Sequence, residues 1–401
     1  MAGKKNADPF EAALASVEEQ FGTENLFSGA EAAKASEDII FDAPRLTWAY
    51  GGGFRLNAIH RLNGKESGGK TTLATFISGQ CQKRKFEKEG NWSKSHVVII
   101  DNERTFDVIH AQDNGLILED PSTGKPLVHV LRNKYVEDQC QAWETLVQTG
   151  LVCATIYDSD AAGISRSEFD SALEKAQFGS GAKAAGIIIK RMNYFVDQYK
   201  TPVLWISQER ANMDIMARLP SVTGGFSVNY FASTRFRVTM KEFITDHGEV
   251  VGIRMKIKNY KNKTGIMSRE CLLDLYFKDG ATYKRGIDGE GQYIDMLVEL
   301  GIVNQHGAWF KYREGQPDEV SCQGMNGVKD WFAKNPEEWQ KVKKLVDDKM
   351  SKHDDVLDAN TGNSDEQSEI AQMKEEDAAD AARKASESEA SVLAAAAAAD
   401  D

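Results

Sequence analysis

Near the start of the chain, apolar residues recur at the spacing of an α-helix. Positions i, i+4, i+7 and i+11 are occupied by Phe10, Leu14, Val17 and Phe21. This spacing places them on one helical face, and Gly22 follows as a stop signal, so the pattern predicts a helix over residues 8–22. Its apolar face must pack either on its own domain or on a neighbouring molecule.

Between residues 45 and 260, short apolar runs alternate with helical patterns. The runs predict strands at Ala58–Leu62, Val97–Ile100, Leu127–Leu131, Val152–Tyr157 and Val203–Ile206. Buried strands that are separated by helices are typical of a parallel sheet covered on both faces. The predicted fold class is therefore α/β, with a mainly parallel central sheet.

Beyond residue 234 the pattern changes. β-forming residues cluster with turns between them, as in antiparallel strands, at Phe236–Val238, Val250–Ile257 and Cys271–Tyr276. A smaller unit, richer in helix, follows at about residues 290–350. Its segments are Ile294–Leu300, the aromatic stretch Gly307–Tyr312, and the helical region Trp331–Val346, which Asn335-Pro336 interrupts.

Composition excludes several classes of protein. The 401 residues suggest two to three domains, and 41% apolar residues can build a sizeable core. No apolar run approaches the roughly 18 residues of a membrane span, and Met1–Phe10 lacks the apolar stretch of a secretory signal. The five cysteines are far apart with no CxxC pair, which indicates reduced thiols in a cytoplasmic protein rather than zinc ligands or disulfides.

The acidity of the chain is concentrated in its last 49 residues. Of the net charge of −12, residues 353–401 carry −11, from 14 acidic and 3 basic side chains. This segment is rich in Ala, Glu, Asp and Ser, which predicts a disordered acidic tail. Composition alone favours a solubility tail, and the body of the chain, at −1, is nearly neutral.

The sharpest chemical signal is a match to GxxxxGK[ST], the phosphate-binding P-loop. A predicted strand precedes it and a predicted helix begins near Lys70, which is the context that the motif requires. Glycines let backbone N–H groups surround phosphates, the lysine contacts the β- and γ-phosphates, and the Thr71 hydroxyl is a Mg²⁺ ligand. The expected phosphate-binding residues are Gly64, Lys65, Glu66, Ser67, Gly68, Gly69, Lys70, Thr71 and Thr72.

Polar side chains end three of the predicted strands on the same rim of the sheet. Asp158 suits a Mg²⁺ site, although it could also be a helix N-cap. Asp101 and Glu103 follow another strand, where a carboxylate could orient and deprotonate a water. Gln208 follows a third, where an amide could sense a γ-phosphate or could simply end the strand.

The segment from residue 210 to residue 225 is polar, long and irregular, and such loops are usually functional. Arginines suit phosphates, and apolar side chains suit insertion between bases. These features make it a candidate DNA-binding loop, with Arg210, Met213, Ile215, Arg218, Gly224 and Gly225 as its candidate contacts. A helix-rich stretch that contains Gly179-Ser180-Gly181 is a possible second mobile loop.

From Phe10 to Val346 the chain resembles the bacterial RecA recombinases and their phage-encoded relatives. The segments that carry the resemblance are Phe10–Gly22, Gly64–Thr72, Ile100–Asp107, Asp158-Ser159, Ile206–Arg210, Thr223-Gly224-Gly225 with Phe231-Ala232-Ser233, Lys261-Asn262-Lys263, Gly307-Ala308-Trp309, Gln323-Gly324 and Asn335-Pro336. They follow one another in the family's order.

The resemblance implies a role for each matching residue. Glu103 would be the water-activating base and Lys70 the phosphate clamp, while Gln208 would couple ATP to the DNA loop. Thr71 and Asp158 would serve Mg²⁺. The remaining cofactor contacts implied are Asp107 and His110 at the adenine, and Lys261 and Lys263 at the ATP of a neighbouring subunit.

The chain departs from the family pattern at four positions. His110 replaces an aromatic residue that stacks on the base, and an imidazole can either stack or simply be an exposed helix histidine. Ser207 stands where an Asn is usual, and Asn229 stands where a Lys is usual, which puts a subunit contact in doubt. Gly68 replaces a Ser, which is expected to be harmless. The resemblance also implies a first DNA loop somewhere in residues 168–182, but this stretch matches the family poorly, so no contacts are assigned to it.

The resemblance implies a RecA-type ATPase core that binds ATP and Mg²⁺, forms helical filaments on single-stranded DNA and pairs it with duplex DNA. Single-strand-binding and mediator proteins are further expected partners, in the cytoplasm of a bacterial cell or a phage-infected host. A hexameric helicase-like ATPase on the same core, and a binding paralogue without hydrolysis, are the alternatives. The expected divisions are an N-terminal helix and linker at 1–37, a core at 38–285, a small α+β C-terminal domain at 286–352, and the tail at 353–401.

Overall fold

The computed structural model describes residues 9–22, 37–170, 180–210, 221–222, 225–263, 265–281 and 283–351. The chain divides into two compact units, Met1–Asp38 and Ile39–Asp401. The first unit contains α1 (Pro9–Phe21), which confirms the predicted N-terminal helix. On its apolar stripe, Phe10 is 67% exposed and Val17 is 41% exposed.

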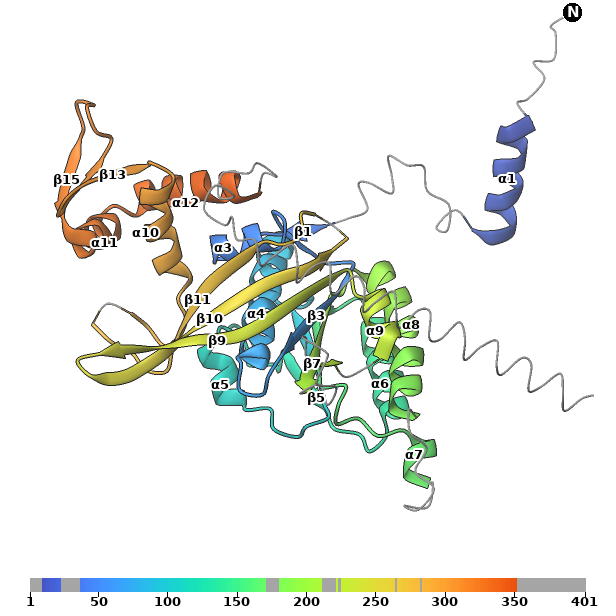
Figure 1. Ribbon diagram of the computed structural model, residues 1–401. Helices are drawn as coiled ribbons and strands as arrows, with labels where there is room; N and C mark the ends of the chain where they lie inside the picture. The colour runs from blue at the N-terminus through green and yellow to red at the C-terminus, as the bar shows by residue number, and fades with distance from the viewer. Residues whose placement is uncertain are drawn as a thin grey trace, which may run out of the picture. The chain divides into compact units, whose positions relative to one another are not determined.

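A mixed sheet forms the centre of the second unit (Figure 1). Its strands, in spatial order, are β12 (Gly286–Ile287), β11 (Glu270–Tyr276), β10 (Glu249–Asn262), β9 (Thr234–Asp246), β3 (Ile59–Gly64), β7 (Val203–Arg210), β6 (Val152–Asp158), β4 (His96–Asp101) and β5 (Val128–Leu131), and β8 (Ser221–Val222) pairs with β7. The five predicted apolar runs all form strands of the parallel part. The predicted antiparallel segments belong to the same sheet, because β9 pairs in parallel with β3.

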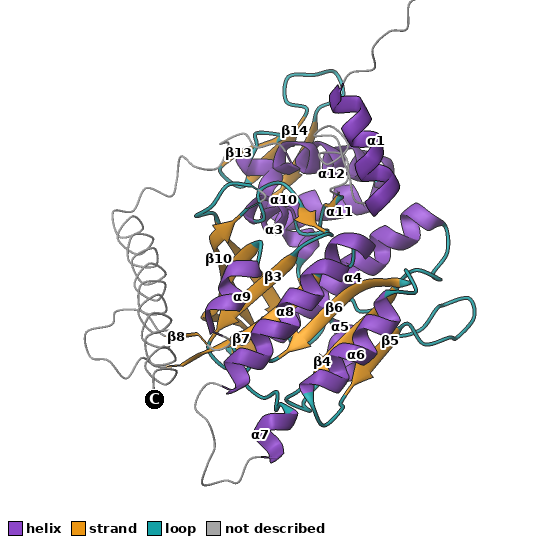
Figure 2. Cartoon of the chain, turned by 90° about the vertical axis from the view of Figure 1, so that its right-hand side faces the viewer, coloured by secondary structure: helices purple, strands orange, loops and turns teal. Residues whose placement is uncertain are grey.

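Helices cover both faces of this sheet, as the alternation of strands and helices predicts (Figure 2). One face packs against α3 (Pro44–Ala49), α4 (Lys70–Glu89) and α5 (Val108–Asp113). The other packs against α6 (Val136–Val147), α8 (Ser180–Tyr199) and α9 (Gly225–Phe231), while α7 (Arg166–Asp170) is a short separate helix. Side chains of successive strand residues alternate between the two cores.

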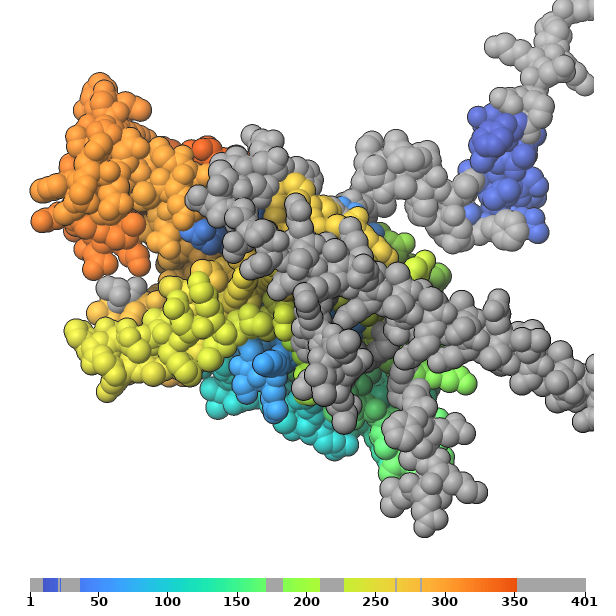
Figure 3. Space-filling model, viewed as in Figure 1, coloured from blue at the N-terminus to red at the C-terminus, as the bar shows by residue number. Residues whose placement is uncertain are grey.

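Strands β9 and β10 form a long hairpin whose far end projects from the core in the space-filling view (Figure 3). Its turn has His247 and Gly248 at φ 48° and 86°. Two successive positive φ values are typical of a type I′ turn, whose twist matches that of the flanking strands. The hairpin therefore continues the sheet beyond the strands that the helices cover.

The C-terminal part of the second unit combines helices with a small antiparallel sheet. Its elements are α10 (Gly289–Glu299), β13 (Val303–His306), β14 (Trp309–Tyr312), β15 (Val320–Gln323), α11 (Gly324–Lys334) and α12 (Pro336–Ser351). The predicted interruption at Asn335-Pro336 separates α11 from α12. The strands β13 and β15 were not predicted, and the aromatic stretch that contains β14 was not assigned to a strand. Apolar residues of α11 and α12 share one core cluster with α3 and α4, so this part packs directly on the helices beside the central sheet.

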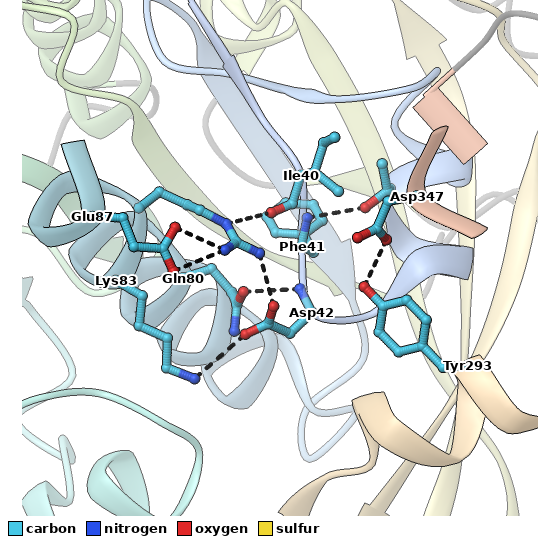
Figure 4. A network of polar contacts seen from close by, with 10 residues as sticks. Ile40, Phe41, Asp42, Gln80, Lys83, Glu87, Tyr293 and Asp347 are labelled. Carbon is cyan, nitrogen blue, oxygen red and sulfur yellow. Dashed lines mark hydrogen bonds and ion pairs between the residues drawn. The ribbon is translucent and has the colours of Figure 1, made fainter. Parts of the chain in front are cut away.

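A polar junction lies where α4 meets the segment that follows β1 (Asp38–Ile39), which pairs with β2 (Phe54–Arg55) (Figure 4). Arg84 donates from Nε to Ile40 O at 3.0 Å and from Nη2 to Asp42 Oδ1 at 2.7 Å. Burial alone would raise the pKa of Asp42, but Arg84, Lys83 and Lys343 together lower it. Tyr293 of α10 donates at 2.6 Å to Asp347 of α12 in the same view.

None of the described helices is both long and apolar enough to cross a membrane. All five cysteines lie in described segments and are free thiols, as their spacing predicts.

Candidate nucleotide-binding site

The phosphate loop connects the end of β3 to the start of α4, as predicted. Gly69 is the N-cap of α4 and has φ 90°, a backbone conformation that favours glycine. A Cβ at this position would also lie 2.2 Å from Met255 Sδ, so any other residue would require the Met255 side chain of β10 to move. The N-terminus of a 20-residue helix therefore faces the loop and favours negative charge there.

Lys70 lies inside the loop with only 7% of its surface exposed. Its Nζ donates to Gly64 O at 3.1 Å and to Lys65 O at 2.6 Å. Burial lowers the pKa of Lys70, although the nearby carboxylates of Asp158 and Glu103 oppose this shift. The loop thus holds the ammonium among backbone carbonyl oxygens at the place where the motif requires it.

Thr71 and Asp158 form a pair beside this lysine. Thr71 Oγ1 donates to Asp158 Oδ2 at 2.7 Å, and Asp158 is 8% exposed. The pKa of Asp158 is raised to about 6, mainly by burial, and the carboxylates of Glu103 and Asp101 contribute to the rise, while the hydrogen bond from Thr71 and the charge of Lys70 oppose it. A hydroxyl and a carboxylate are the hard oxygen ligands that Mg²⁺ takes, so this pair fits the expected metal.

Glu103 and Gln208 meet directly across the rim of the sheet. Gln208 Nε2 donates to Glu103 Oε1 at 2.7 Å, and Ser159 Oγ donates to the same oxygen at 2.6 Å. The structure therefore brings the proposed base and the proposed γ-phosphate sensor together, as the common rim of their strands predicts. Ser159 is a positioning contact that the sequence analysis did not assign.

Asp101, the other carboxylate considered for water activation, accepts hydrogen bonds from other groups of the protein. Its carboxylate accepts from Arg132 Nε at 2.8 Å and from the backbone N–H groups of Thr105 and Phe106 at 3.3 Å each. Asp101 thus holds the turn that follows β4. This leaves Glu103 as the carboxylate of this segment that faces the pocket.

His110 and Asp107 have different surroundings. The His110 ring lines the pocket, and its Nε2 is 2.9 Å from Thr72 Oγ1. Asp107 is the N-cap of α5 and accepts from the backbone N–H groups of Ile109 and His110 at 2.8 and 3.1 Å. Its carboxylate thus fixes the short helix that carries His110.

The pocket itself has a volume of about 480 Å³, within the usual range for a small-molecule site. The phosphate loop from Glu66 to Thr72 lines one side, together with Glu103, His110, Asp158 and Gln208. The other side is an apolar wall that the sequence analysis did not assign, formed by Met240, Phe243, Ile253, Leu275 and Phe277 of the hairpin and the end of β11.

Lys261 and Lys263 do not line the pocket of their own chain. Lys261 of β10 pairs with Arg235 of β9, and Arg235 pairs with Arg61 near the amino end of β3. The phosphate loop follows the opposite, carboxyl end of β3. Lys261 Nζ donates to Asn229 O, and Lys263 Nζ donates to Tyr230 O at 2.8 Å. The structure therefore separates these lysines from the phosphate loop of the same chain.

Most of the candidate DNA contacts lie outside the described residues. The contacts outside the described residues are Met213, Ile215, Arg218 and Gly224. Residues 171–179 of the first loop and the tail from 353 to 401 also lie outside them. Arg210 ends β7 and Gly225 begins α9, so the described backbone locates the two ends of the second loop and the short strand β8 within it.

The sheet, the phosphate loop and the acid–amide pair define a P-loop nucleotide-binding protein of the α/β class. The family model for the RecA N-terminal domain matches residues 8–282, and that for the RecA C-terminal domain matches residues 291–351. The chain belongs to the RecA family of recombinases. This membership assigns it to DNA recombination and repair, with ATP and DNA binding.

Curated relatives named Protein RecA align over most of both chains. That of Mesoplasma florum is 28% identical over 338 residues, 82% of this chain and 92% of the relative. That of Malacoplasma penetrans is 29% identical over 86% of this chain and 96% of the relative. That of Streptomyces rimosus is 29% identical over 87% of each.

Proposed function

We propose that this protein is a DNA-dependent ATPase and recombinase that forms helical filaments on single-stranded DNA and catalyses homologous pairing and strand exchange. The hydrogen bond between Glu103 and Gln208 beside the phosphate loop carries the proposal. It joins a group suited to activating water to a group on the strand that leads into the candidate DNA loop.

Each residue of the pocket has a distinct task in the proposed hydrolysis. The loop amides and Lys70 hold the phosphates, and Thr71 with Asp158 would hold Mg²⁺, which supplies charge neutralisation at the phosphates. Glu103 orients a water and accepts its proton. Positioning and electrostatics of this kind supply most of the catalysis in phosphoryl transfer.

Two features of the described residues support assembly into filaments. Phe10 and Val17 on the apolar stripe of α1 are exposed, and Lys261 and Lys263 lie away from their own phosphate loop. We propose that both act on the neighbouring subunit, with α1 and its linker at 1–37 as the contact, the core at 38–285 as the motor and 286–352 as an accessory domain. Single-strand-binding and mediator proteins are the further partners proposed.

A paired measurement tests this function. ATP hydrolysis is measured with and without single-stranded DNA, and the same mixtures are imaged by electron microscopy. We expect hydrolysis that single-stranded DNA stimulates, together with helical filaments. Closed rings without filaments would favour the helicase-like alternative, and filaments without hydrolysis would favour a binding paralogue.

A further inference from the structure

Arg61 lies on β3, three residues before Gly64, and its side chain has no exposed surface. At least three neighbours contact its guanidinium. Nε donates to Ser207 Oγ at 2.9 Å, Nη1 donates to Asn229 Oδ1, and Nη2 lies 3.6 Å from Asp160 Oδ2. Since a guanidinium stays protonated at any pH at which proteins fold, this position carries a permanent buried cation.

The counter-charge is equally buried and well satisfied. Asp160 has no exposed side-chain surface, and its Oδ2 accepts from Ser207 Oγ at 2.7 Å and from Trp205 Nε1 at 3.0 Å. A buried ion pair adds little stability compared with apolar side chains of the same volume. The pair is therefore better explained by a geometric role than by packing. We call Arg61, Asp160, Ser207 and Asn229 the Arg61 network.

The network lies directly behind the nucleotide pocket. Asp160 lies two residues after Asp158, and Ser207 lies directly before Gln208; both Asp158 and Gln208 line the pocket. Arg61 lies three residues before Gly64, where the phosphate loop begins. Successive side chains of a strand point to opposite faces, so Gln208 faces the pocket while Ser207 faces Arg61. A displacement of Gln208 thus moves Ser207 against the buried ion pair.

The fourth member connects the network to the subunit-contact side of the sheet. Asn229 accepts from Arg61 with its side chain, and its backbone oxygen accepts from Lys261 Nζ at 2.5 Å. Asn229 lies on α9, which follows the candidate DNA loop. A lysine at position 229, the residue usual in the family, would place a second cation against Arg61, whereas asparagine offers an acceptor.

We propose that the Arg61 network transmits the state of Gln208 to α9 and Lys261, with Arg61 as a positioning residue rather than a catalytic one. The two departures at Ser207 and Asn229 are then one feature, because both side chains bind the same guanidinium. This inference rests on the proposed function, since it concerns how ATP and DNA binding are coupled.

The test compares DNA-free and DNA-stimulated ATP hydrolysis in the full-length protein. For Ser207→Ala and Asn229→Ala we expect an unchanged KM for ATP and unchanged DNA-free turnover, with stimulation by single-stranded DNA reduced about tenfold, a usual size for coupling between two sites. Ser207→Thr keeps the hydroxyl and restores stimulation. Thr234→Val is the matched control, because it removes a buried hydrogen bond between His60 of β3 and β9 outside the network.

A double variant, Arg61→Gln with Asp160→Asn, is the second test if Ser207→Ala or Asn229→Ala fails to fold. It removes both charges of the buried pair together, so no unpaired buried charge remains. It should lose stimulation as Ser207→Ala does. The inference is overturned if the Ser207 and Asn229 variants are stimulated by DNA to the wild-type ratio. It is also overturned if DNA-free and DNA-stimulated turnover fall equally, in proportion to the loss of thermal stability. Absence of stimulation in the wild-type protein overturns the proposed function instead.

Discussion

The amide of Gln208 and the carboxylate of Glu103 are joined by a hydrogen bond of 2.7 Å, although 105 residues separate them in the chain. Gln208 lies near the end of β7, and Glu103 lies in the turn after β4, so the contact spans two strands across β6. One oxygen of Glu103 is therefore held by both Gln208 and Ser159. The orientation of the proposed base depends on the position of the strand that leads to the DNA loop.

The first prediction concerns this base. Glu103→Gln should keep ATP and DNA binding, because the amide has the same shape, but should reduce hydrolysis at least 100-fold, as expected for a lost general base. Turnover and nucleotide binding are measured separately. Glu87→Gln, which changes an exposed carboxylate on α4 that pairs with Arg84, is the control and should hydrolyse ATP normally. Near wild-type turnover in Glu103→Gln would reject the assignment.

The second prediction concerns α1. Removal of residues 1–24 should leave a folded, ATP-binding monomer that forms no filaments, because the exposed stripe of α1 would contact an adjacent subunit. The double variant Phe10→Ala with Val17→Ala should weaken assembly, whereas Glu11→Ala with Glu18→Ala changes only polar positions of the same helix. Light scattering on single-stranded DNA measures assembly, and normal polymerisation of the truncated protein would assign the stripe to its own domain.

The third prediction concerns Lys261 and Lys263. A Lys261→Ala/Lys263→Ala variant and a Lys70→Ala variant should each lose hydrolysis, since one lacks the lysines and the other lacks the phosphate clamp. An equimolar mixture should recover roughly a quarter of wild-type turnover, because random order along a head-to-tail filament pairs an intact loop with intact lysines at that frequency. Filaments in the mixture without any recovered hydrolysis would mean that the lysines do not act across the interface.

The fourth prediction concerns pH. His96 Nδ1 and His129 Nε2 are 3.0 Å apart on β4 and β5. Burial lowers the pKa of His96 below its ordinary value of 6.5, and His129 lowers it further. A depressed pKa in the folded state gives stability that is present above pH 6.5 and is lost as the pH falls through the folded pKa.

Unfolding by urea between pH 7.5 and 5 checks this expectation. The free energy of unfolding should fall less steeply with decreasing pH in His96→Asn than in the wild type. His247→Asn, at a 97% exposed side chain in the hairpin turn, is the matched control and should follow the wild-type slope. Parallel slopes for all three proteins would contradict the assignment.

The fifth prediction concerns the acidic segment. Residues 353–401 carry a charge of −11 on a body of −1 that must nevertheless bind a polyanion. A chain of this length can reach on the order of 40 Å if it is flexible. It can therefore compete with phosphates for Arg210, Arg218 and nearby lysines, and salt or Mg²⁺ should weaken that competition. Truncation after Lys352 should then speed duplex binding most at low Mg²⁺ and low salt.

Titration of labelled duplex with the full-length and truncated proteins, across a Mg²⁺ series, measures this effect. ATP affinity should not change, because the nucleotide pocket is formed by residues of the core. Superimposable duplex-binding curves at every Mg²⁺ concentration would support a solubility tail instead.

The parallel part of the fold could be predicted from the sequence because each buried strand forms a continuous apolar run. Lys70, Thr71 and Asp158 could also be placed, since a local motif and the ends of parallel strands locate them without knowledge of packing. The capping role of Asp107 was not predicted. A carboxylate before a helix gives the same sequence pattern whether it caps the helix or binds a ligand.

The apolar wall of the pocket and the Arg61 network could not be predicted, for a different physical reason. Both depend on strand order, which brings β9 and β7 to either side of β3. A lone arginine within the run Ala58–Leu62 carries no local sign that Asp160 and Asn229 will surround it. Pairing across long stretches of chain determines these contacts, and periodicity describes only short ones.

The position of β3 also has a consequence for biosynthesis. The strand that carries the phosphate loop is made early, but its two partners, β7 and β9, leave the ribosome more than 140 residues later. Contacts of such long range make a chain slow to fold, and a nascent chain that ends before Phe277 lacks part of the pocket wall. Nucleotide binding should therefore arise abruptly during translation, once the β9–β10 hairpin has been made and packs beside the phosphate loop.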